Sequence, residues 1–294
     1  MITVSVPGKV HLMGEHAVVY GKPALLAAIN RRLTVTVTDG DSNTNGYVAD
    51  ILGIVQKHFG TTRAVHITID SDIPAGYHLG SSAAVAVGVI GAVSYFLKKI
   101  WNPTLINQLA YEAEKLQHGN PSGADNTAVT FGGLIWYRKE LEFLKNIWQL
   151  PLNLPAALNH FSLIDTGRPK ENTGEMVAYV RQQFTIRASQ FEKLFDENEE
   201  QTKRTTVALK EGDEKALIDA IQKGEQTLEG MGVVSKKVIP LIRSIEKAGG
   251  AAKILGGGGR ADGVGYLLCY SHRSPAGSIP ILLGEEGVRL ENKL

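Results

Sequence analysis

The stretch HGNPSGADN at residues 118–126 places one carboxylate, Asp125, in a turn of Gly, Pro and Ser residues. It directly follows a helical segment that carries Glu112 and Glu114. Glycine and proline supply the backbone angles of a sharp turn, and an Asp in such a turn often stabilises it by bonding to nearby backbone N–H groups. The stretch alone therefore fits either a structural turn or an acid that projects into a site.

Two segments earlier in the chain supply complementary chemistry. PGKVHLMGEH at residues 7–16 offers a cation, Lys9, and PAGYHLGSSAA at residues 74–84 runs from a strand through a loop into a helix. The first turn of a helix has unpaired N–H groups and a positive dipole end, which attract phosphate. The hydroxyls of Ser81 and Ser82 could reach phosphate or Mg²⁺, although serine also simply caps helices. Together the three segments are typical of phosphoryl transfer to a small hydroxyl compound.

Composition sets the broad class of the protein. The chain has 294 residues, 43% hydrophobic and 21% charged, which is ordinary for a globular protein long enough for two domains. A net charge of +1 without a long basic run argues against nucleic acid or an anionic membrane as partner. The single Cys269 excludes an internal disulfide and fits a reducing compartment.

The N-terminus alternates like a strand and does not have a signal-peptide pattern. The longest apolar run, residues 83–97, is short for a membrane span. We therefore expect a cytoplasmic protein.

Hydrophobic periodicity predicts a mixture of strands and helices, and hence the α+β class. The predicted strands are an opening strand over residues 2–12 that Pro7-Gly8 breaks, then 31–38, 64–69, 129–138, 160–165, 263–270 and 279–283. The predicted helices are 49–59, an apolar helix capped by Ser81-Ser82, 103–118, 173–199, 214–229 and 235–248. The proline-containing stretch 150–157 predicts a boundary between domains 1–155 and 156–294.

Several common motifs are absent, namely the Walker loop, G-x-G-x-x-G, H-E-x-x-H and G-x-S-x-G. Residues 249–259 instead contain six glycines, more than a turn between a helix and a strand needs. Because glycine lets the backbone come close to a ligand, this segment favours a contact with phosphate.

The segments resemble the three motifs of the GHMP kinase family, in the family's order and over nearly the whole chain. Within that family the mevalonate kinases are most similar, on GEHAVVYG at residues 14–21 and HGNPSGADN at residues 118–126. DTGRPK at residues 165–170 is similar to a further stretch near their active site.

The resemblance implies an N-terminal ribosomal-protein-S5-like domain, a C-terminal ferredoxin-like domain, and ATP-dependent phosphorylation of the C5 hydroxyl of mevalonate in isoprenoid precursor biosynthesis. It implies that Asp125 is the catalytic carboxylate and that Lys9 pairs with it. It also implies ATP and mevalonate as partners, Mg²⁺ as cofactor, no nucleic acid or membrane partner, and a homodimer.

The resemblance assigns further roles by position. Mg²⁺ would be held by Ser82 and Glu114. The mevalonate-binding site would be lined by Glu15, His16 and Thr166. The residues implied for ATP binding are Pro74, Gly76, Leu79, Gly80, Ser81, Ser82 and Ala83.

The chain departs from the family pattern at four positions. Tyr77 and His78 replace smaller residues of the phosphate loop, His78 standing where Gly is usual. Leu255 replaces a Ser or Thr, and the glycine run stops at Arg260. The planar guanidinium of Arg260 could bind phosphate oxygens, or it could be a surface group.

Three alternatives remain open at this point. The chain could be another GHMP kinase, acting on phosphomevalonate, homoserine or a sugar. It could be a non-catalytic ligand-binding regulator of the same fold, although the presence of Lys9, Glu114 and Asp125 argues against this. A decarboxylase that acts on a phosphorylated mevalonate derivative would release CO₂.

Overall fold

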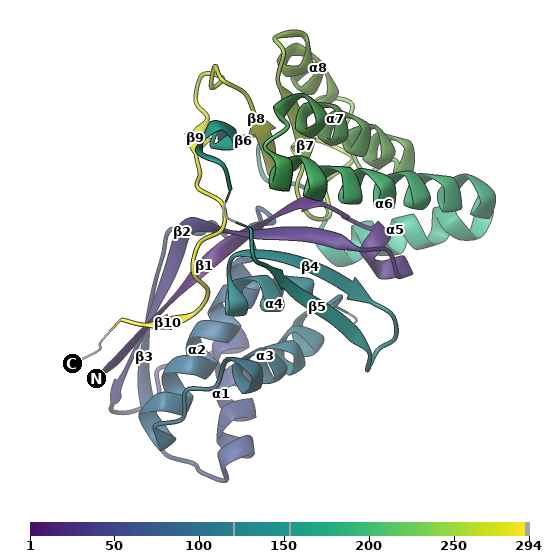
Figure 1. The fold of residues 1–294 in the computed structure, drawn as a ribbon. Helices are drawn as coiled ribbons and strands as arrows, with labels where there is room; N and C mark the ends of the chain where they lie inside the picture. The colour runs from purple at the N-terminus through teal and green to yellow at the C-terminus, as the bar shows by residue number, and fades with distance from the viewer. Residues whose placement is uncertain (120, 153, 292–294) are drawn as a thin grey trace.

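The computed structural model describes residues 1–119, 121–152 and 154–291. In these residues two antiparallel sheets are each covered by helices, and the two halves stack on one another (Figure 1). Strands and helices follow one another irregularly along the chain, and this confirms the predicted α+β class.

The first sheet has six strands in the order β10-β1-β2-β4-β5, with β3 paired to β2. Its strands are β1 (Ile2–Met13), β2 (Ala24–Asp39), β3 (Val65–Ser71), β4 (Leu134–Lys139), β5 (Lys145–Leu150) and β10 (Arg289–Leu290). The long β2 pairs with β1 on one side and, on its other side, with β4 near its start and β3 near its end. The helices of this half are η1 (Ala17–Tyr20), α1 (Gly46–Phe59), α2 (Ser81–Lys98), α3 (Pro103–His118) and α4 (Ala124–Phe131).

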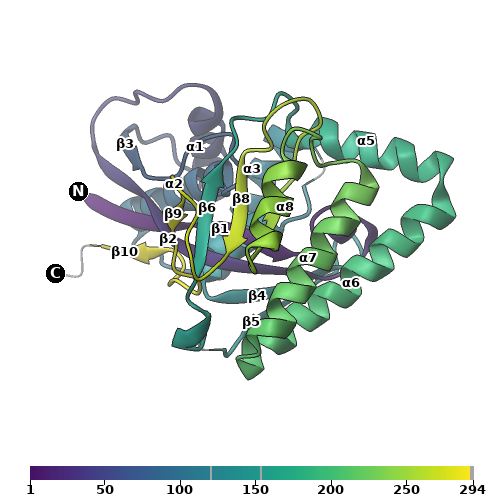
Figure 2. The same cartoon turned by 90° about the horizontal axis from the view of Figure 1, so that it is seen from above.

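The second sheet has four strands in the order β7-β8-β6-β9. Its strands are β6 (Phe161–Asp165), β7 (Ala251–Ile254), β8 (Tyr266–Tyr270) and β9 (Ile279–Pro280). The helices of this half are η2 (Ala156–Leu158), α5 (Thr173–Ile186), α6 (Ala188–Glu211), α7 (Glu214–Met231) and α8 (Ile239–Lys247). Figure 2 shows α6 and α7 side by side, and both helices contact β1 of the first sheet.

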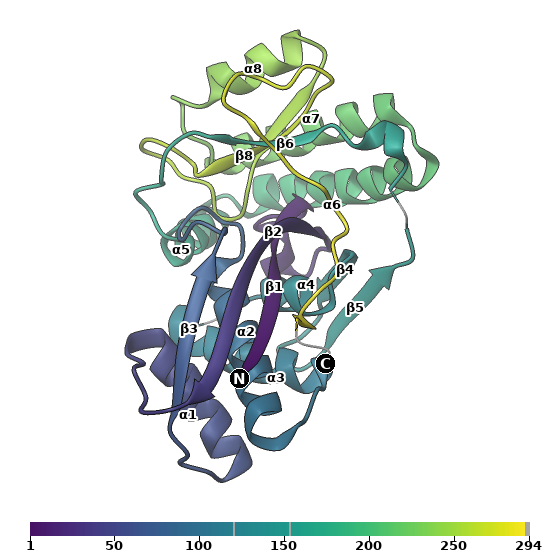
Figure 3. The same ribbon diagram turned by 90° about the vertical axis from the view of Figure 1, so that its left-hand side faces the viewer.

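The C-terminal tail returns to the first half of the chain. After β9 it runs down to the first sheet, where Val4 of β1 pairs with Leu290 of β10 (Figure 3). The tail therefore contributes a strand to each sheet, β9 to the second and β10 to the first. The division into domains 1–155 and 156–294 stays a prediction.

The apolar helix α2 is the one helix, among the described residues, that is long and apolar enough to cross a membrane. Of its residues, 61% are buried, and it lies against β1, β2, α1 and α3 as the core helix of the first half. Its small residues permit this close packing: a Cβ at Gly88 would lie 2.7 Å from a methyl group of Val35.

Most predicted elements are present, and the errors have local causes. Pro7-Gly8 does not end the opening strand, because β1 continues through a register shift between these residues, as strands do at bulges. Ser81 and Ser82 do not cap α2; its N-cap is Gly80, with a positive φ of 77° and no side-chain cap bond. The predicted helix over residues 173–199 is two helices that meet at Arg187, where ψ is 49°.

The predicted strand over residues 129–138 is wrong in its first part. Residues 124–131 form α4, and the strand begins only at Leu134. The β-branched Val129 and Thr130 favour a strand locally, but both are buried on a short helix against α2 and β1. Tertiary packing therefore overrides their propensity and places Asp125 in the first turn of a helix.

Candidate active site

The structure brings three distant segments together around Lys9. This lysine lies on β1 with 1% of its surface exposed, and its Nζ is 3.0 Å from Asp125 Oδ1. Its backbone N–H donates to Leu79 O at 3.0 Å. The lysine stem runs beside Gly80, where a Cβ would lie 2.9 Å from Lys9 Cγ. Glycine at position 80 thus gives the cation room between the phosphate-type loop and Asp125.

Asp125 occupies the first turn of α4, whose N-cap residue Gly123 has the left-handed conformation. A helix N-terminus favours a negative charge at this position. Its side chain is 39% exposed, so its carboxylate is accessible while it pairs with Lys9. Burial alone would raise the pKa of this carboxyl, but the charge of Lys9 and the contact with His11 outweigh burial and hold the pKa well below its ordinary value.

His11 is a site residue that sequence reasoning did not select. Its Nε2 lies 3.4 Å from Asp125 Oδ1, the same oxygen that Lys9 contacts. Burial, and secondly the charge of Lys9, lowers the pKa of His11, so the imidazole is uncharged at neutral pH. The signal was present, because alternation along the first strand places Lys9 and His11 on one face.

Ser82 and Glu114, the two residues implied for Mg²⁺, lie in contact with each other. Ser82 Oγ is 3.5 Å from Glu114 Oε2, and the Tyr47 hydroxyl donates to Glu114 Oε1 at 2.8 Å. A carboxylate and a hydroxyl are oxygen donors of the kind that Mg²⁺ accepts, usually together with substrate phosphates. Among the residues that the structure describes, no group of three His, Cys, Asp or Glu side chains could hold a metal by itself. The two residues therefore fit a magnesium ion that takes its other ligands from a nucleotide.

The loop before α2 has the geometry of an anion cradle. The Ala84 N–H donates to Gly80 O at 2.9 Å and closes the first turn of α2, and the N–H groups of a helix's first turn point out of its N-terminal end. Ser81 Oγ donates to Ile73 O at 3.5 Å, and both Leu79 and Ala83 are buried.

Pro74 is partly buried at the start of this loop. Gly76 has a φ of 82°, and a Cβ there would lie 2.9 Å from Arg168 Nε. A guanidinium from the second half of the chain thus lies against this loop.

The three residues expected to line mevalonate have partners from the second half. Glu15, 1% exposed, forms an ion pair with the fully buried Lys253. His16 Nε2 lies 3.1 Å from Gly257 O. Thr166 donates to Gly265 O at 2.7 Å and accepts from the Val264 N–H at 3.0 Å. Glu15 and His16 thus connect the two halves of the chain, and Thr166 connects two loops of the second half. The contacts of these three residues with a substrate stay predictions.

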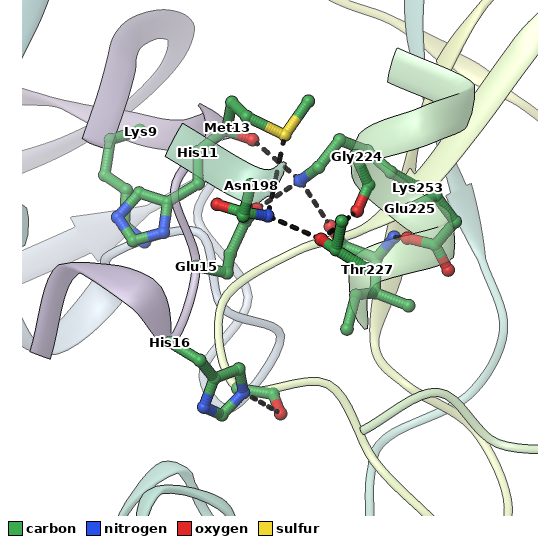
Figure 4. A network of polar contacts seen from close by, with 12 residues as sticks. Lys9, His11, Met13, Glu15, His16, Asn198, Gly224, Glu225, Thr227 and Lys253 are labelled. Atoms are coloured by element: carbon green, nitrogen blue, oxygen red, sulfur yellow. Dashed lines mark hydrogen bonds and ion pairs between the residues drawn. The ribbon is translucent and has the colours of Figure 1, made fainter. Parts of the chain in front are cut away.

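Lys253 and Glu225 belong to a buried polar network beside Lys9 and His11 that sequence reasoning missed, and the backbone of Ile254 connects them (Figure 4). Lys253 Nζ also donates to Ile254 O at 2.7 Å and to His11 O at 3.2 Å. Glu225 Oε2 accepts from the Ile254 N–H at 3.0 Å, and burial raises the pKa of this carboxyl well above its ordinary value. The available signal was a single lysine inside the apolar run AAKIL at residues 251–255.

The departures from the family pattern have structural consequences. His78 adopts a left-handed φ of 64°, which explains why glycine suits this position. Its ring packs on the glycine-rich segment, where a Cβ at Gly256 would lie 2.7 Å from His78 Cβ. Burial, with a smaller effect of Lys9, lowers the pKa of His78 to about 4.

Leu255 and Arg260 lie at the two ends of the glycine run. Leu255 is fully buried in the core. The Arg260 guanidinium stacks on the Tyr179 ring at 3.8 Å, and its backbone N–H donates to Glu171. This packing places Arg260 against α5.

Comparisons with known proteins identify the family of the chain. Residues 46–133 match the family model described as GHMP kinases N terminal domain. The mevalonate kinase of Archaeoglobus fulgidus is 32% identical, over 98% of this chain and 99% of that protein. The mevalonate kinase of Thermococcus onnurineus is 31% identical, over 100% of this chain and 99% of that protein.

Solved structures share the fold. The L. major mevalonate kinase in complex with R-mevalonate has a TM-score of 0.76 at 24% identity, over 92% of this chain and 87% of that one. The Methanococcus jannaschii mevalonate kinase has a TM-score of 0.74 at 22% identity, over 98% and 96%. With relatives above 30% identity along its whole length, the chain belongs to the mevalonate kinase family of the GHMP kinases.

Proposed function

We propose that this chain transfers the γ-phosphoryl group of ATP to the C5 hydroxyl of mevalonate and forms 5-phosphomevalonate. The observation that carries the proposal is the Lys9–Asp125 pair, 3.0 Å apart, beside the start of α2. Full-length relatives that are mevalonate kinases support the choice of substrate. GEHAVVYG and HGNPSGADN favour it over phosphomevalonate, homoserine or a sugar.

Phosphoryl transfer requires positioning and charge stabilisation more than covalent chemistry. The N–H groups at residues 81–83 and the positive end of α2 would hold the triphosphate. Glu114 and Ser82 would hold Mg²⁺, which offsets phosphate charge when bound. Orientation of alcohol and phosphate in line can supply about 7–11 kcal/mol of the barrier.

Asp125 accepts the proton of the substrate hydroxyl. A carboxylate with a depressed pKa is a weak base for an alcohol, so the proton transfer needs assistance. Lys9 assists by stabilising negative charge that develops on the alcohol oxygen. The same ammonium keeps Asp125 ionised between turnovers.

The test is ATP-dependent phosphorylation of mevalonate, with ADP release followed by a coupled assay and the product phosphate located by ³¹P NMR. A panel with phosphomevalonate, homoserine and galactose separates this activity from those of related kinases. Binding of ATP and mevalonate without ADP release would instead support a regulator, and CO₂ release would support a decarboxylase. A homodimer and a cytoplasmic location remain predictions, testable by light scattering and cell fractionation.

A further inference from the structure

His11 lies two residues after Lys9 on β1, and both side chains reach Asp125 Oδ1, at 3.4 Å and 3.0 Å. His11 is 7% exposed, and within the described residues neither ring nitrogen has a well-aligned hydrogen bond. A buried polar group with so few partners is costly and calls for an explanation. The direction of the ring supplies one, because Nε2 faces the carboxylate on which the chemistry depends.

The charges at this point determine which nitrogen carries the proton. Asp125 is ionised and can only accept hydrogen bonds, so the nitrogen that faces it is stabilised when it carries hydrogen. The imidazole is uncharged and has one proton to place. With that proton on Nε2, the nitrogen left without a partner is an acceptor, and an unpaired acceptor is more often tolerated than an unpaired N–H.

We propose that His11 is a positioning residue for Asp125: its uncharged imidazole donates from Nε2 to Oδ1 beside Lys9, which turns the second carboxylate oxygen toward the substrate hydroxyl. The inference rests on the proposed function. We expect the 3.4 Å contact between Nε2 and Oδ1 to shorten in the substrate complex, because catalytic hydrogen bonds are often long in free enzymes. A neutral donor orients the carboxylate without a second full positive charge, which would make Asp125 a still weaker proton acceptor.

The second half of the chain holds His11 in place. Its backbone oxygen accepts from Lys253 Nζ at 3.2 Å, and Lys253 is paired with Glu15. Figure 4 shows Lys253 approaching the end of β1 from the opposite side to the His11 ring. The charged and titratable groups around the imidazole are Lys9, Glu15, His16, Asp125 and Lys253.

The decisive comparison is between His11→Gln and His11→Leu. The glutamine amide carries N–H groups that can reach the position of Nε2, whereas leucine fills similar space without a donor. We expect His11→Leu to lower kcat about 10–100-fold with KM for ATP unchanged, because only orientation in the transition state is lost. We expect His11→Gln to stay within about 3-fold of wild type. Equal loss in both variants, or no loss in His11→Leu, would overturn the proposal.

A matched control removes a histidine from the same sheet. His66 lies exposed on β3, and His66→Leu should leave kcat unchanged. The pH profile adds a readout that mere packing would not move. Because the pKa of His11 is lowered, wild-type kcat should fall only at a pH below the ordinary histidine value of about 6.5, as His11 gains charge beside Lys9, and this step should be missing in His11→Gln. The same acid limb in both proteins would count against a role of the imidazole.

NMR separates this inference from the proposed function. If the wild-type protein releases no ADP with mevalonate, the proposed function fails, and ¹⁵N-histidine spectra still test His11. The expected result is a proton on Nε2 and a midpoint below the ordinary 6.5, lowered further in Asp125→Asn because the aspartate charge raises the pKa of His11. A proton on Nδ1, or a midpoint that Asp125→Asn leaves unchanged, would refute the placement.

Discussion

The substitution Lys253→Met tests the buried ion pair that connects the two halves of the molecule. Lys253 is fully buried, and its ammonium contacts Glu15, His11 O and Ile254 O. Methionine keeps most of the aliphatic volume but leaves Glu15 as a buried carboxylate without its cation. Removal of one partner of such a pair costs about 3–5 kcal/mol.

Urea denaturation at pH 7 measures the loss in the free energy of unfolding. A thermal melt gives a second measurement. At about 2–4 °C for each kcal/mol of lost stability, the melting temperature should fall by about 6–20 °C. The double variant Lys253→Met, Glu15→Gln removes both charges. Its loss in the free energy of unfolding should be about 1–3 kcal/mol smaller than the losses of the two single variants added together.

A surface lysine provides the control for this experiment. Lys203 pairs with Glu199 on α6 and is 53% exposed. Lys203→Met should therefore cost less than about 1 kcal/mol, as exposed ion pairs do. If Lys253→Met costs no more than this control, or if the two charge removals add without coupling, the buried pair does not hold the halves together.

Four further predictions address single residues. Asp125→Asn should lower kcat about 10²–10⁴-fold in a folded protein, as loss of a positioned proton acceptor does; turnover near that of wild type would reject its role. Glu114→Gln should chiefly raise the Mg²⁺ concentration at half-maximal rate, whereas an unchanged magnesium titration would count against metal binding. His78→Gly should change KM for ATP because its ring packs on Gly256, and an unchanged KM would show that the ring is not needed. Folding raises the pKa of Glu225, so the stability that its protonated carboxyl contributes is fully present below pH about 4.5 and is lost as the pH rises through the raised pKa of the folded protein. Glu225→Gln should therefore be about as stable as wild type near pH 4 and more stable than wild type at pH 8. Thermal melts of both proteins at the two pH values check this.

Local sequence determined the parts of the fold that rest on periodicity and turn residues. The alternation along β1, the helix that begins at Pro103 and ends before Gly119, and the apolar run of α2 all follow from patterns within a few turns of chain. The Gly-Pro-Ser composition of residues 118–123 likewise indicated a turn before Asp125. The helix α4 could not be predicted in this way, because the strand propensity of Val129 and Thr130 is reversed by burial against α2 and β1.

The amino-acid sequence alone supplied the chemical groups: a lysine, two acids, a helix start that suits phosphate, and motifs similar to those of one kinase family. The resemblance implied that Lys9 pairs with Asp125, but the contact itself forms only in the folded chain, because Lys9, Gly80 and Asp125 are separated by many residues and come within contact distance when β1, α2 and α4 pack together. The tertiary structure also decided that His11 shares the oxygen of Asp125 with Lys9 and that Lys253 neutralises Glu15. The spacing of Lys9 and His11 places both on one face of the strand, but which acid they contact depends on burial and on distances across the fold.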